Sequence, residues 1–124
     1  MNYEETLKGM LDAAAGAAKG QWRALCGYAE EEFRRLGEAA AGLEADYLAD
    51  LADARLQPDA EKRARMEARA RRRAELAFAS LKLAAEGVVI AAKADAKLAA
   101  QDAVNAALGV LRAAINKSVG VALF

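Results

Sequence analysis

The chain contains no histidine, one cysteine and one proline, and aromatic residues make up only 6% of its 124 positions. Without histidine, Ser-His-Asp and Cys-His catalysis, most zinc sites and the Glu-x-x-His motif of di-iron bundles are excluded. Three consecutive acids, Glu30, Glu31 and Glu32, point about 100° apart on a helix and cannot converge on one ion. We therefore expect no enzymatic activity, no cofactor, no metal and no small-molecule substrate.

Long apolar runs are also missing. The longest stretch without a charged residue is Ala103 to Leu111, far below the roughly 18 residues that cross a bilayer as a lone helix. The first residues show no basic segment followed by an apolar one, which a secretory signal requires. We expect a protein made in the cytoplasm without a signal peptide. The lone Cys26 cannot form an intramolecular disulfide and is expected to be a small buried residue.

What the chain has in abundance is alanine, at 35 positions. Alanine is the best helix former, and the only strong breaker, Pro58, stands almost at the midpoint within Gln57-Pro58-Asp59. This distribution predicts an all-α fold and a single domain over residues 1–124. The domain is a long antiparallel helical hairpin with a first arm over about 2–56, a second over about 58–117 and a short apolar tail at 118–124.

The first arm begins with a capping pattern, Asn2 followed by Glu5. Apolar positions then recur every eleven residues, at about 3.67 residues per turn, which indicates a nearly straight buried stripe. Two such series are Tyr3, Ala14, Leu25, Leu36, Tyr47 and Leu7, Ala18, Ala29, Ala40, Leu51. The arm also carries six of the nine glycines. They indicate either close approach of a neighbouring helix or kinks near Gly16–Gly20 or Gly37–Gly42.

The two halves carry opposite charge although the net charge is zero. Residues 1–57 hold six Lys or Arg against eleven Asp or Glu, and residues 58–124 hold twelve against seven. A chain that folds back at Pro58 would bring together residues whose numbers sum to about 115. The sequence therefore predicts three pairs across the turn: Asp53 with Lys62, Asp50 with Arg65 and Asp46 with Arg69.

The second arm becomes apolar around most of its circumference after Leu76. One partner arm cannot cover such a helix, so it is expected to lie inside a larger bundle or against lipid. We therefore predict a homo-oligomer in which copies or other subunits pack on this arm. The candidate self-association residues are Leu11, Trp22, Leu25, Phe33, Leu36, Tyr47, Leu51, Val88, Ile90, Leu98, Val104, Leu108, Leu111 and Ile115.

Residues 62–73 form the strongest local charge feature, with seven basic residues and one acid, Glu67. One interpretation is a phosphate or partner contact through Lys62, Arg65, Arg69 and Arg72, which share one helical face. The other is pairing with the acids across the turn. The second is favoured, because nearby carboxylates offset the field and no aromatic residues are interleaved for base stacking.

Three functional hypotheses follow. The first is a non-enzymatic, self-associating structural protein that forms a bundle, ring or tube, as an internal, ejection or tail-associated component of a phage particle. The second is an amphipathic coat on lipid or on a hydrophobic granule, with a membrane pore formed around Gly87 to Leu111 as a variant. Its loose resemblance to apolipoprotein-like and phasin-like chains rests on alanine content and the eleven-residue period. The third is a nucleic-acid-binding helical module that uses residues 62–73.

Overall fold

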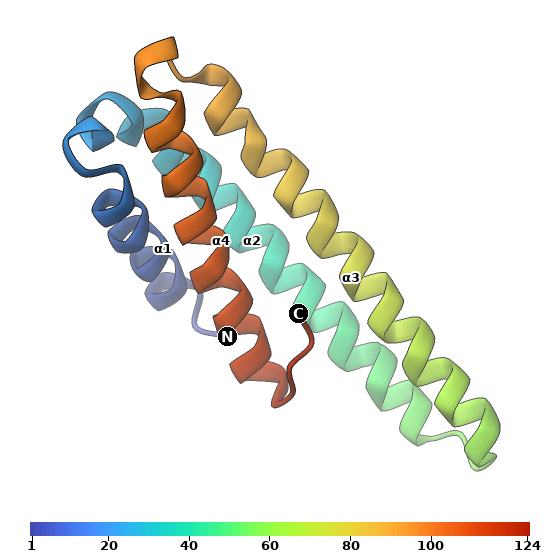
Figure 1. Ribbon diagram of the computed structural model, residues 1–124. Helices are drawn as coiled ribbons and strands as arrows, with labels where there is room; N and C mark the ends of the chain where they lie inside the picture. Colours follow the sequence, from blue (N-terminus) through green and yellow to red (C-terminus); the bar gives the residue numbers. More distant parts are fainter.

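The computed structural model describes all 124 residues as an all-α protein. Its elements, in order, are α1 (Tyr3–Ala18), η1 (Lys19–Gln21), α2 (Trp22–Arg55), α3 (Ala60–Ala91), η2 (Ala94–Ala96) and α4 (Lys97–Val119). All four α-helices lie side by side at one end, and α2 and α3 continue beyond α1 and α4 as a projecting two-helix hairpin (Figure 1). The predicted all-α class and the hairpin at the midpoint are confirmed in this form.

The turn of the hairpin lies between Arg55 and Ala60. The Asp59 side chain accepts a hydrogen bond from the Lys62 backbone N–H at 3.0 Å and so caps α3. Arg63 donates to the backbone carbonyls of Gln57 at 3.1 Å and Pro58 at 3.4 Å. One arginine of the basic stretch is therefore used to hold the turn.

The first arm is broken once. Its chain leaves the helix at Lys19, a non-glycine residue with φ 53°, inside the Gly16–Gly20 segment predicted for a kink. Gly42 and Gly37 lie within the unbroken α2. Gly37 marks a close approach instead, since a Cβ there would lie 3.0 Å from the Tyr3 ring. Both interpretations of the glycines thus apply, at different positions.

The second arm, predicted over about 58–117, is not one unbroken helix. Ala92 and Lys93 adopt extended backbone, with ψ 146° and 155°, and the chain reverses there. The Lys97 ammonium donates to the carbonyls of Val89 at 3.0 Å and Ile90 at 3.4 Å. It thereby gives the Ile90 carbonyl a partner at the end of α3 and adds a second one to the Val89 carbonyl, which also accepts from the Ala92 backbone N–H at 3.2 Å. The reversal places α4 against α1, α3 and α2.

A single hydrophobic cluster of 26 buried residues fills the bundle. Its largest fully buried side chains include Phe33, Met10, Leu111 and Ile115. The eleven-residue spacing correctly identifies the buried stripe, because Ala14, Leu25, Leu36 and Tyr47 are all buried. Many of the other members are alanines, so the helices pack closely along their length.

Both ends of the chain are held by its own helices. The Met1 amino group donates to Glu44 Oε1 at 3.0 Å, and the Ser118 hydroxyl donates to the same oxygen at 2.8 Å. Because Glu44 is buried, these contacts give one of its carboxylate oxygens the partners that burial requires, while the other oxygen, Oε2, is buried without a hydrogen-bond partner.

The predicted tail at 118–124 starts slightly later, because α4 continues to Val119 and ends at Gly120 with φ 78°. Asn116 Oδ1 accepts from the backbone N–H groups of Leu123 at 2.9 Å and Phe124 at 3.0 Å. Leu123 is buried in the core, and the Phe124 ring stacks on Phe78 with centroids 4.4 Å apart. The tail therefore closes one side of the bundle.

Candidate interaction surfaces

Most of the predicted self-association residues lie inside the single chain. Val88 and Leu108, for example, belong to the same buried cluster as Phe33. The full set of these buried residues is Leu25, Phe33, Leu36, Tyr47, Val88, Val104, Leu108, Leu111 and Ile115. The sequence predicted that these residues contact another subunit, but in the structure they make contacts within one chain. The physical reason is the reversal at Ala92 and Lys93, which lets the chain's own helices cover α4.

The remaining predicted residues are at least partly accessible. Leu11, Trp22 and Leu51 are half-buried against the core, while Ile90 and Leu98 are each 77% exposed. Cys26 is also only half-buried, and its thiol donates to the Arg23 carbonyl at 3.6 Å. Of the predicted self-association residues, only Ile90 and Leu98 are therefore fully open to a second molecule.

The outer face of α3 carries a row of large exposed apolar side chains. Leu76, Leu83 and Ile90 are 58%, 76% and 77% exposed and are spaced seven residues apart. The buried side of the same helix is formed by residues such as Phe78 and Ala85, and at 100° per residue the row lies nearly opposite them. We call Leu76, Leu83 and Ile90 the apolar stripe. Apolar residues repeated every seven positions supply one of the two apolar positions per heptad by which paired helices pack.

Two charged residues lie along one side of this stripe. Lys82 and Glu86 are four residues apart and therefore share one side of α3, next to Leu83. Neither takes part in an ion pair within the chain. Glu86 accepts one hydrogen bond, from the Gln101 side chain at 3.2 Å.

The basic stretch lies on the projecting part of α3. Lys62, Arg65, Arg69 and Arg72 are all exposed, and we call these four residues the basic stripe. None of the three predicted pairs across the turn forms. The one ion pair between α2 and α3 joins Asp50 to Arg73 at 3.3 Å, eight residues further along α3 than predicted.

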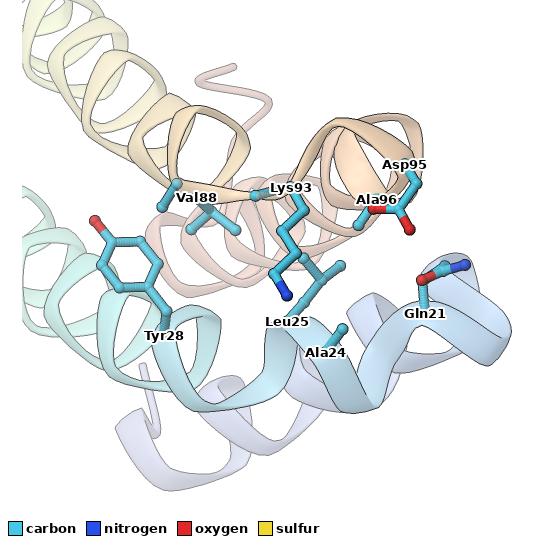
Figure 2. A pocket seen from close by; sticks show the side chains of 10 residues that line it. Gln21, Ala24, Leu25, Tyr28, Val88, Lys93, Asp95 and Ala96 are labelled. Carbon is cyan, nitrogen blue, oxygen red and sulfur yellow. The ribbon is translucent and has the colours of Figure 1, made fainter.

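A pocket of about 380 Å³ lies where both arms break. Its walls come from the start of α2, the end of α3 and η2, with Tyr28 and Val88 on opposite sides and Lys93 extended toward Leu25 (Figure 2). The lining is rich in alanine, and no hydrogen bond joins its polar side chains to one another. The pocket offers no positioned nucleophile or acid–base pair, so we assign it no chemistry.

One titratable group is clearly perturbed. Desolvation by burial, reinforced by the Glu38 carboxylate and opposed by Arg34, raises the pKa of the Tyr3 hydroxyl. Tyr3 donates to the Arg34 carbonyl at 3.1 Å. This hydrogen bond joins α1 to α2. The Tyr3 hydroxyl has no partner group that would make it reactive.

Comparisons with protein-family models, with curated proteins and with solved structures found no match. None of the helices is both long and apolar enough to cross a bilayer. No three acidic, cysteine or histidine side chains group together in a way that could hold a metal ion. The two surfaces with distinctive chemistry are the apolar stripe and the basic stripe.

Proposed function

We propose that this protein is a non-enzymatic structural subunit that self-associates through the apolar stripe on α3. The observation that carries the proposal is the exposure of Leu76, Leu83 and Ile90 on a helix whose opposite side is already packed. Single exposed leucines are ordinary, but three large apolar side chains in register on one helical face form a row of apolar surface that water solvates poorly. A second copy of the same helix covers such a stripe by knobs-into-holes packing.

Symmetry and charge favour an antiparallel pair. A two-fold axis at Leu83 would place Leu83 on the partner's Leu83 and Leu76 on the partner's Ile90. In a parallel pair, the basic stripe would instead lie against its own copy, and like charges in contact are unfavourable. The antiparallel arrangement sends the two basic stripes to opposite ends of the interface.

The flanking charges support the same orientation. In an antiparallel helix pair, the same side of each helix meets across the interface, so Lys82 would face the partner's Glu86 at both symmetric positions. Neither side chain has an ion-pair partner in its own chain, and the hydrogen bond from Gln101 occupies only one oxygen of the Glu86 carboxylate. Small neighbours, Ala79 and Gly87, would let the two backbones approach closely.

The size of the stripe sets the expected affinity. Leu76 and Ile90 are about 21 Å apart along the helix axis at 1.5 Å per residue. A single helix pair of that length falls at the small end of specific interfaces, so we expect a dissociation constant on the order of micromolar. Sedimentation velocity over a concentration series would test this. A species that stays monomeric at the highest concentration reached would contradict self-association, and partitioning onto liposomes in a flotation assay would favour the coat hypothesis.

A charge exchange tests the orientation. Lys82→Glu should weaken self-association about fivefold or more, because it sets two carboxylates against each other at both symmetric positions. Adding Glu86→Lys should restore the pairing, since the double variant again has opposite charges across the interface. Sedimentation velocity gives the dissociation constant of each variant. Thermal melting at protein concentrations below the dissociation constant checks that the monomer is unchanged. Failure of the double variant to recover would argue against the antiparallel pair.

The biological setting that we propose for this subunit is an internal, ejection or tail-associated position in a phage particle. Small alanine-rich helical proteins that pack side by side suit such a role. Quantitative mass spectrometry of purified particles from cells that express the protein would test this setting. Its presence at a fixed ratio to the major structural proteins is expected, and its absence from the particles would rule the setting out.

A further inference from the structure

The basic stripe lacks the acidic partners that would neutralise it. Lys62, Arg69 and Arg72 make no ion pair, and Arg65 reaches only Glu61 on its own helix, at 4.0 Å. Across the turn, Asp50 is engaged by Arg73 instead. The ion pairs predicted for Lys62, Arg65 and Arg69 across the turn are therefore absent, although Asp50 and Asp53 line one pocket with Arg69.

The position of the stripe makes it accessible. The α2–α3 hairpin projects beyond α1 and α4 (Figure 1). The stripe begins near the turn of this hairpin, and its other end lies where Arg71 donates to the Ala122 carbonyl of the C-terminal tail at 3.3 Å. Its four side chains span about 15 Å along the helix axis at 1.5 Å per residue. One strand of a DNA duplex carries a phosphate about every 3.4 Å along its axis, so this span matches about four phosphates.

We infer that the basic stripe binds the phosphate backbone of duplex DNA without sequence preference. Single strands are disfavoured as the ligand, because the projecting segment has no aromatic side chain on the stripe for base stacking. A membrane surface is disfavoured as well. The residues between the basic ones include Ala64 and Ala68, whereas helices that lie on lipid insert large apolar residues. This inference uses different residues from the self-association proposal and stands independently of it.

Salt dependence provides the test. Fluorescence anisotropy would measure binding of the full chain to a labelled duplex of mixed sequence. With about four phosphates contacted, the affinity should fall about a hundredfold between about 50 and 200 mM salt. Replacing Arg65, Arg69 and Arg72 together by glutamine should weaken binding at low salt at least tenfold. It should also reduce the salt effect to about threefold, since one phosphate contact remains.

A matched control removes the same charge elsewhere. Lys8, Arg23 and Lys117 are exposed and make no ion pair, so changing all three to glutamine should leave DNA affinity within about threefold of the original. Circular dichroism checks that both triple variants fold. The inference is overturned by absence of DNA binding at low salt, or by equal losses in the two variants. Binding to phosphatidylserine vesicles without binding to DNA would also overturn it.

Discussion

Replacement of Leu83 by glutamate is expected to convert the self-associated protein into a monomer. In the proposed pair, Leu83 lies on the two-fold axis, so one substitution places two carboxylates against each other in an apolar contact. Burial of an ionised group without a partner costs several kcal/mol. At about 1.4 kcal/mol per factor of ten, the dissociation constant should rise at least a hundredfold.

Sedimentation velocity measures this shift directly, and Leu56 supplies the matched control. Leu56 is 81% exposed but lies in the turn, away from the apolar stripe, so Leu56→Glu should leave self-association unchanged. In the monomer both positions are on the surface, and both variants should keep the original stability to within about 0.5 kcal/mol. If Leu83→Glu still self-associates, the interface lies elsewhere on the molecule.

The position of the hairpin could be predicted because local chemistry determines it. Pro58 cannot continue a helix, and Asp59 supplies a cap for the next one. The buried side of the first arm was also predictable, since the eleven-residue spacing of Leu25, Leu36 and Tyr47 reflects the geometry of the helix itself. These features depend on neighbours close in sequence.

The break in the second arm could not be predicted in the same way. Ala91, Ala92 and Lys93 all favour helix, and no glycine or proline marks the site. The reversal depends on Lys97, which binds the last carbonyls of α3, and on the fit of α4 against α1. Tertiary packing therefore overrides helix propensity at this point, as it commonly does when an amphipathic face can be buried.

The prediction of the interaction surfaces was wrong for the same reason, because it treated the second arm as one continuous helix. The spacing of Leu76, Leu83 and Ile90 is visible in the sequence, but which side of α3 faces outward becomes known only once α4 is placed. With one continuous second arm, Leu111 and Ile115 required an external partner. With α4 folded back, they are fully buried in their own chain. The unpartnered apolar surface thus moves to the outer face of α3.

A core that is complete in one chain implies that Phe33→Ala should destabilise even the monomer. Phe33 is fully buried in the middle of α2, and truncation of such a phenylalanine costs about 3–5 kcal/mol. Urea denaturation of Phe33→Ala in the Leu83→Glu background would measure folding without self-association. Tyr28→Ala is the control, because Tyr28 lies on the same helix but is 49% exposed. This substitution should lower the free energy of unfolding by less than about 1 kcal/mol. If the Leu83→Glu monomer already lacks a cooperative transition, the chain needs its neighbours to fold, and the apolar stripe is then part of the core rather than a contact between finished subunits.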